Sequence, residues 1–278
     1  NQRALHWAQV KIYGALLCQA RNLDEVTLTL VYLDIATEKE TLLSQQASAG
    51  ELETFFITQC ERFIAWAEQE AAHRIARDAA LGMLRFPHAS FRPGQRELAE
   101  DVYRAASTGR CLLTQAPTGI GKTLGTLFPM LTAMPRQRLD RIAFLTMKTP
   151  GRRLALDALA QLRPDKQTAE NSGQDAPRVL ELIARDKACE YPGTACHGDA
   201  CPLAAGFYDR LPAARQAAVA ESWWDREALR KVALAHGVCP YYLGQELARW
   251  ADVIVGDVNH WFDRYALLHG LAQANEWR

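Results

Sequence analysis

Residues 111–123 read Cys-Leu-Leu-Thr-Gln-Ala-Pro-Thr-Gly-Ile-Gly-Lys-Thr, an apolar run that leads into a glycine-containing loop and a Lys-Thr pair. Gly119 and Gly121 allow the backbone to bend so that successive N–H groups point inward, an arrangement that binds phosphate. The Lys122 ammonium can reach the β- and γ-phosphates of a nucleotide, and the Thr123 hydroxyl can bind Mg²⁺. The sequence therefore predicts a nucleotide-binding loop with Lys122 and Thr123 as catalytic residues and further contacts from Pro117, Thr118 and Ile120.

The segments on either side of this loop are apolar. Residues 111–114 are predicted to form a short buried strand and residues 124–131 a helix, the strand–loop–helix order that phosphate binding requires. The usual pattern begins with glycine, and here that position is Ala116. In this form, Ala-Pro-Thr-Gly-Ile-Gly-Lys-Thr, the loop resembles motif I of superfamily 2 helicases.

The composition is that of a globular protein of about two domains. Of the 278 residues, 49% are hydrophobic and 23% are charged, and the formal net charge is zero. A nucleic-acid partner is therefore not indicated by overall charge. No apolar run approaches the ~18 residues of a membrane span, and the N-terminus lacks a signal-peptide pattern, so we expect a cytoplasmic protein without membrane contacts.

The first 85 residues show helical, alternating and again helical patterning. We expect a helix over 4–20, a hairpin of strand 25–34 with a second strand to 45, and a long amphipathic helix from 51 to about 80. Gln9 and Tyr13 lie in a segment that resembles the Gln-x-x-x-Tyr motif of RecB-type PD-(D/E)XK nucleases. This resemblance covers only the tail of that domain and places its metal ligands before residue 1. Ordinary core and surface roles for Gln9 and Tyr13 are the alternative.

Phe91-Arg-Pro-Gly-Gln-Arg-Glu97 follows a break in the pattern at 86–90 and overlaps a predicted helix over 95–106. It resembles the Q motif of helicases. The Gln95 amide can both donate to and accept from an adenine edge, and Phe91 can lie against the ring. Phe91, Arg92 and Gln95 are therefore predicted to bind the nucleotide. The alternative is a Pro-Gly turn that only caps the helix.

Residues 141–146 are predicted to form a buried parallel strand, and the turn at 147–152 resembles helicase motif Ia. Hydroxyl groups at the carboxyl end of a parallel strand can bind the phosphates of a single DNA strand. Thr146, Lys148 and Thr149 are the predicted DNA contacts. A purely structural turn would explain the Pro-Gly pair but would not require the hydroxyl groups.

The chain contains seven cysteines, of which Cys18, Cys60 and Cys111 stand alone in apolar segments. An odd number of thiols in a reducing compartment favours metal ligation over disulfides. The remaining four, Cys189, Cys196, Cys201 and Cys239, are the predicted metal ligands.

These four thiols can bind either zinc or an iron–sulfur cluster, and His197 is an alternative ligand. A polar stretch at 163–177, predicted to be a mobile loop, precedes them. Their irregular spacing, with a helical segment predicted over 213–235 inside the last gap, favours a cluster held by loops over paired zinc knuckles.

Residues 251–256 form a second apolar run, predicted to be a strand that ends at Asp257. An acid in this position could bind Mg²⁺. Because no glutamate follows that could orient water, we predict that Asp257 is not this acid.

The order of these segments resembles the DinG/XPD-like family of iron–sulfur DNA helicases over roughly residues 86–278. The resemblance implies an α/β fold in which a RecA-like P-loop lobe carries an inserted iron–sulfur domain and follows an α/β nuclease-like fragment. The implied domains are the nuclease-like tail at 1–85, the first part of the lobe at 86–178, the cluster domain at 179–243 and the return to the lobe at 244–278.

The same resemblance implies an ATP-dependent helicase that moves 5′ to 3′, with ATP, Mg²⁺ and a [4Fe–4S] cluster as cofactors. It would act as a monomer on single-stranded DNA and duplex junctions, and Trp223 and Trp224 are expected on the DNA-facing surface. The DEAH box and the second RecA-like lobe are expected after residue 278, so this fragment is expected to be inactive alone. The alternative is a non-catalytic, zinc-stabilised module that binds nucleotide and nucleic acid.

Overall fold

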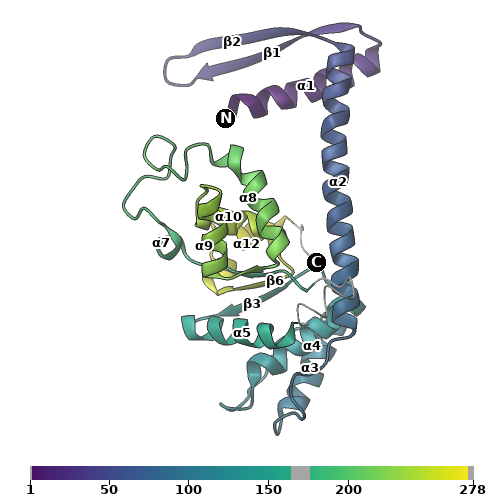
Figure 1. The fold of residues 1–278 in the computed structure, drawn as a ribbon, viewed down its shortest axis with the longest axis vertical. Helices are drawn as coiled ribbons and strands as arrows, with labels where there is room; N and C mark the ends of the chain where they lie inside the picture. Colours follow the sequence, from purple (N-terminus) through teal and green to yellow (C-terminus); the bar gives the residue numbers. More distant parts are fainter. Residues whose placement is uncertain (1, 164–175, 275–278) are drawn as a thin grey trace. The chain divides into compact units, whose positions relative to one another are not determined.

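The structure is a computed structural model that describes residues 2–163 and 176–274. The chain divides into two compact units, Asn1–Ala72 and His73–Arg278. Helix α2 (Ala49–Gly82) contains the division (Figure 1). Within the described ranges, no helix combines the length and the apolar character needed to cross a membrane. The loop predicted at 163–177 falls almost entirely outside the described residues.

The first unit contains helix α1 (Gln2–Arg21), an antiparallel hairpin of β1 (Glu25–Asp34) and β2 (Lys39–Ser48), and the start of α2. The hairpin is in register from Glu25 opposite Ser48 to Asp34 opposite Lys39. Helix α2 begins with a capping box, because Ser48 Oγ accepts from the Glu51 N–H (3.3 Å) and the Glu51 carboxylate accepts from the Ser48 N–H (3.0 Å). The predicted helix, hairpin and long helix are confirmed.

The second unit is built on a parallel sheet with strand order β3-β6-β4-β5. Its strands are β3 (Ile142–Thr146), β4 (Val179–Glu181), β5 (Trp223–Trp224) and β6 (Val253–Asp257). The predicted strands at 141–146 and 251–256 are thus confirmed as neighbours. Strands β4 and β5 fall within the range predicted for the cluster domain, yet they belong to this same sheet.

Helices cover both faces of the sheet, as the continuous apolar character of its strands requires. Val253 and Val255 pack with helices α4 and α5, whereas Ile254 points to the other face and packs with α8, α9 and α10. Figure 1 shows these two helical layers on opposite sides of β3 and β6. The helices of this unit are α3 (Gln95–Thr108), α4 (Lys122–Gln137), α5 (Thr149–Leu162), α7 (Arg185–Ala188), α8 (Phe207–Glu221), α9 (Arg226–Ala235), α10 (Pro240–Leu247), α11 (Asn259–Phe262) and α12 (Leu267–Gln273).

Two tryptophans predicted to face DNA lie in the sheet. The helical segment predicted over 213–235 consists of α8 and α9, separated by β5. Trp224 is only 1% exposed, and its indole N–H donates to the Ala218 carbonyl oxygen. Trp223 is half-buried against the Arg163 guanidinium group, at 5.0 Å. The predicted surface role of Trp224 is therefore wrong, because this side chain fills the core.

The segment before the glycine loop also differs from its prediction. Residues 111–117 form no strand, and Leu112 and Leu113 are 39% and 98% exposed. The buried strand predicted over 111–114 is therefore wrong, because no strand among the described residues offers it the backbone hydrogen bonds that a strand requires.

A buried carboxylate joins the C-terminal part of α2 to the sheet. Asp252, which directly precedes β6, lies 2.8 Å from His73 Nε2 and accepts from Arg77 Nη1 (2.7 Å) and from the backbone N–H of Arg178 (2.7 Å). Burial by itself raises the pKa of Asp252, but the hydrogen bond to His73 and the charges of His73 and Arg77 outweigh it and lower the pKa below its usual value. The carboxylate is therefore charged at neutral pH.

We predict that Asp252→Asn lowers the free energy of unfolding by about 3–5 kcal/mol at neutral pH, because it leaves Arg77 buried without its counter-charge. Urea denaturation followed by circular dichroism measures this loss. Asp157→Asn, which removes an exposed carboxylate paired with Arg153 on α5, is the matched control and should have little effect.

The loss of unfolding free energy on Asp252→Asn should depend on pH. Because the pKa of Asp252 in the folded protein lies below its usual 3.8, the carboxylate contributes fully above that value and loses its contribution as the pH falls through the folded pKa. The difference between wild type and Asp252→Asn should shrink over this acidic range. A difference that is near zero at neutral pH would contradict the assigned role.

Candidate functional site

The glycine loop leads directly into helix α4. Gly119 and Gly121 have φ angles of +87° and +83°, the left-handed region that favours glycine. Gly121 is the N-cap residue of α4, and its carbonyl oxygen accepts from the Gly125 N–H (2.9 Å). The free N–H groups and positive dipole end of this 16-residue helix therefore face the loop, an arrangement suited to an anion.

Lys122 and Thr123 form the first turn of α4. The Lys122 side chain is exposed and lies over the loop, where its ammonium donates to the carbonyl oxygens of Ala116 (3.1 Å) and Pro117 (2.9 Å). Thr123 is half-buried. These carbonyl contacts are solvent-accessible and can be exchanged for phosphate oxygens without disturbing the core.

Gln95 and Arg92, predicted to contact the nucleotide, brace the loop itself. The Gln95 amide donates to the Gly121 carbonyl oxygen (3.0 Å) and accepts from the Arg92 N–H (3.0 Å). Arg92 Nη1 donates to the Gly119 carbonyl oxygen (2.7 Å). Gln95 is 3% exposed. The Gln95 amide therefore positions Gly121 while Arg92 positions Gly119. The contact of Gln95 with adenine stays a prediction.

Phe91 belongs to an aromatic cluster beside the loop. Its ring stacks on Phe86 with centroids 3.9 Å apart and lies 6.4 Å from the Phe128 ring. A largely apolar cavity of about 690 Å³ runs along α3 and α4, and Phe91 and Phe128 form part of its wall. Phe91 is thus placed where a flat ring could pack against it, whereas the Gln95 amide does not line this cavity.

The predicted DNA-contacting residues lie together at the carboxyl edge of the sheet. Thr146 ends β3, and its hydroxyl donates to the Lys148 carbonyl oxygen (3.1 Å), while Lys148 and Thr149 are exposed. Asp257 ends β6 opposite Thr146. Its carboxylate accepts from the Asn259 N–H (3.0 Å), which gives it a structural role at this turn.

Three further ionisable residues at this edge, Arg152, Glu181 and His260, were not predicted to belong to the site. Arg152 on α5 is buried, and its Nε lies 3.6 Å from Glu181 at the end of β4 without forming a hydrogen bond. Burial, with a smaller contribution from Arg152, lowers the pKa of His260 despite the opposing charge of Asp257. The signal in the sequence was the run of basic residues directly after the Pro-Gly pair, which was assigned to the turn alone.

The four cysteines predicted to bind metal come from two places, the connection between α7 and α8 and the start of α10. Cys189 follows the short helix α7, Cys196 and Cys201 lie in the turns that come next, and Cys239 is the N-cap residue of α10. Cys196 is exposed and the other three are half-buried. His197, the alternative ligand, is exposed and lies 3.9 Å from Asp199.

Cys239 interacts electrostatically with Cys189 and Cys201, whereas Cys196 interacts with Tyr242. Burial raises the pKa of Cys239, the backbone N–H groups of Tyr242 and Tyr241 lower it, and the charges of Cys189 and Cys201 raise it further. The charge of Cys196 contributes to the raised pKa of Tyr242, behind burial. Nevertheless, the described residues contain no set of three or more Cys, His, Asp or Glu side chains arranged to hold a metal ion.

A loop with positive-φ glycines thus leads into a helix that begins with Lys-Thr and packs on the parallel sheet of a mixed α/β unit. Residues 173–267 match the DEAD_2 family. The chain is also 32% identical, over 85 residues, to a probable ATP-dependent helicase of Methanocaldococcus jannaschii. These two matches support a helicase family for the C-terminal part of the chain.

A solved structure described as an XPD helicase is similar to 64% of this chain, with 18% identity and a TM-score of 0.41. The chain covers 30% of that structure. The similar region accounts for 31% of this chain and 13% of the archaeal relative. The chain thus spans a small part of the length of the proteins it resembles.

The two loop glycines allow a matched test of the Gln95 brace. A Cβ atom at Gly121 would lie 2.3 Å from Gln95 Nε2, whereas a Cβ at Gly119 would meet nothing within 4 Å. Gly119→Ala should lower the free energy of unfolding by about 1–2 kcal/mol, because alanine is strained at this positive φ. Gly121→Ala should cost about 1–2 kcal/mol more, because the Gln95 hydrogen bonds are lost as well.

Urea denaturation of the two variants measures this difference. In a Gln95→Ala background the obstruction is absent, so both glycine substitutions should then cost the same. Equal costs in the presence of Gln95 would contradict the brace.

Proposed function

We propose that this chain is part of an ATP-dependent DNA helicase and that residues 117–123 bind the nucleotide phosphates. The observation that carries the proposal is the position of Lys122. Its ammonium lies over a loop of two left-handed glycines at the N-terminus of a long helix. Two independent features, namely the free N–H groups at the positive end of the helix dipole and the lysine charge, thus converge on one point. The helicase family indicated for residues 173–267 supports ATP as the nucleotide.

In this proposal Lys122 neutralises the β- and γ-phosphates and the Thr123 hydroxyl binds Mg²⁺. Arg92 and Gln95 hold the loop carbonyls so that the N–H groups remain available. Phe91 packs against the base. The loop and its neighbours would form part of a RecA-like lobe that contains the parallel sheet.

The carboxyl edge of the sheet is proposed to bind single-stranded DNA. Thr146, Lys148 and Thr149 offer hydroxyl groups and a positive charge at this edge, where ligands bind in open α/β sheets. The burial of Arg152 beside Glu181 would help to fix the start of α5. From the resemblance to the DinG/XPD-like family, we further propose that the protein moves 5′ to 3′ along DNA, acts at duplex junctions and works as a monomer.

Cys189, Cys196, Cys201 and Cys239 are proposed to hold a [4Fe–4S] cluster. The donor set fits, because four thiolates suit iron, and Cys189, Cys201 and Cys239 already interact electrostatically. The N–H groups of Tyr241 and Tyr242 would stabilise the Cys239 thiolate. A bound cluster would cross-link the loop between α7 and α8 to the start of α10.

The first unit is proposed to be the tail of a RecB-type nuclease-like domain. Its order of helix, hairpin and helix agrees with that resemblance, and the Gln9 amide donates to the Tyr13 hydroxyl (3.2 Å) on the exposed side of α1.

We predict that Lys122→Ala lowers the affinity for Mg·ATP at least about tenfold, because the lysine makes a charge-assisted contact to phosphate. Isothermal titration calorimetry with the wild type and the variant measures this change. Lys39→Ala, an exposed lysine at the start of β2, is the control and should bind as the wild type does. Equal affinity of wild type and Lys122→Ala would refute the assignment of the loop.

The cluster is tested by metal analysis of protein purified without oxygen. We expect brown protein with about four iron and four sulfide ions per chain. Colourless protein that contains zinc would refute the cluster and favour the metal-stabilised binding module.

A further inference from the structure

The N-terminal half of α9 is firmly anchored in the second unit. Its N-cap residue, Asp225, accepts from the Ala228 N–H (2.9 Å) and from the Trp223 indole N–H (3.0 Å). The N–H of Arg226 donates to Glu181 at the end of β4 (3.2 Å), and Leu229 is buried in the core. Side chains on this part of α9 therefore project from a fixed base.

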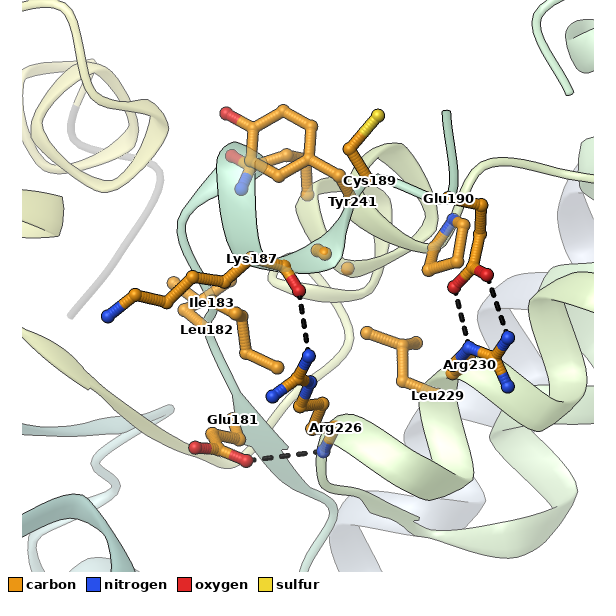
Figure 2. Close-up of a pocket in the computed structure, with 14 residues that line it drawn as sticks. Glu181, Leu182, Ile183, Lys187, Cys189, Glu190, Arg226, Leu229, Arg230 and Tyr241 are labelled. Atoms are coloured by element: carbon orange, nitrogen blue, oxygen red, sulfur yellow. Dashed lines mark hydrogen bonds and ion pairs between the residues drawn. The ribbon is translucent and has the colours of Figure 1, made fainter. Parts of the chain in front are cut away.

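Two arginines one turn apart on α9 reach the segment that carries Cys189. Arg226 Nη2 donates to the Lys187 carbonyl oxygen (3.0 Å), and Arg230 binds the Glu190 carboxylate through two hydrogen bonds of 2.6 and 2.7 Å. Residues four apart lie on the same face of a helix, so both contacts come from one side. Figure 2 shows them on either side of Cys189, whose sulfur points away from both guanidinium groups.

Packing contributes little to this attachment. A cavity of about 260 Å³ lies between residues 187–190, here named the Cys189 segment, and the facing parts of α9 and α10. Leu229 lines this cavity together with Arg226 and Arg230 (Figure 2). Because part of the space behind the segment is open, the arginine contacts are direct links between the segment and α9.

Arg230 and Glu190 form an ion pair in which the Arg230 side chain is 53% exposed and the Glu190 side chain 23% exposed. The two hydrogen bonds in parallel fix the orientation of the carboxylate as well as its distance. Glu190 directly follows Cys189, so this contact restrains the backbone next to the thiol.

We propose that Arg226 and Arg230 are positioning residues for Cys189, holding the Cys189 segment against α9 with its thiol directed away from both guanidinium groups. The value of this arrangement for metal binding rests on the proposed function of the four cysteines. The attachment itself is a property of the protein with or without metal. It requires no contact between either arginine and the metal.

Hydrogen exchange tests the attachment in metal-free protein. The N–H groups of Lys187, Ala188 and Cys189 donate to carbonyl oxygens of Ala184 and Arg185, so their exchange reports opening of this segment. Arg226→Met and Arg230→Met should each speed their exchange about threefold or more, and the double variant further, as expected for loss of charge-assisted contacts. Arg153→Met, which breaks an exposed ion pair on α5, is the control and should leave this exchange unchanged.

A charge swap separates positioning from a general loss of stability. Glu190→Arg should open the segment, and the double variant Glu190→Arg with Arg230→Glu should restore slow exchange. Unchanged exchange in both methionine variants, or failure of the swap to restore protection in a folded protein, would overturn the proposal.

Iron content and hydrogen exchange, measured together, test the attachment by the arginines separately from the proposed cluster. If the protein contains iron, a chelator should remove the iron from the Arg230→Met variant about threefold faster than from the wild type. This factor is the one expected for the loss of one ion pair. Metal-free wild type with accelerated exchange in the variants would refute the cluster and keep the attachment. Iron-containing wild type with unchanged exchange in the variants would keep the cluster and refute the attachment.

Discussion

The ion cluster around Asp252 is the interaction on which the second unit depends. It brings His73 and Arg77 from the C-terminal part of α2, the Arg178 backbone before β4 and the start of β6 to one buried carboxylate. Arg77 also donates to the Asp140 carbonyl oxygen just before β3 (3.0 Å). Three adjacent strands of the parallel sheet are thereby set in register at their amino ends. Their carboxyl ends, which carry the candidate site residues, then lie side by side.

A second set of contacts fixes the glycine loop, residues 116–121, independently of the sheet. Gln95 and Arg92 on one side hold the carbonyl oxygens of Gly121 and Gly119, and the left-handed glycines direct the N–H groups to the other side. The loop is thus shaped before it meets an anion, which reduces the ordering cost of binding. The residues that resemble an adenine-recognition motif have, in this structure, the additional task of shaping the loop.

Periodicity predicted the elements well because it reports burial of a face. The hairpin of the first unit and strands β3 and β6 follow directly from alternating or continuous apolar patterns. The same signal failed at residues 111–114, since an apolar run does not say which strand will accept its hydrogen bonds. The prediction for Trp224 rested on its aromatic character, and a large aromatic side chain suits a core and a DNA surface equally well. The adenine contact of Gln95 stays a prediction, and only the fold shows that its amide bonds to the backbone of Gly121 and Arg92. Arg230 and Glu190 are forty positions apart, so no local sequence pattern predicts that they pair.

The most direct test of the central claim is a crystal structure of this chain with Mg·ADP. The account predicts that the β-phosphate lies at the N-terminus of α4, bound by the Lys122 ammonium and by backbone N–H groups of the loop, with the Lys122 contacts to Ala116 and Pro117 exchanged for phosphate oxygens. Gln95 and Arg92 should keep their bonds to the loop carbonyls. ADP bound elsewhere, or a loop free of nucleotide with Lys122 still bonded to Ala116 and Pro117 at saturating ADP, would contradict the account.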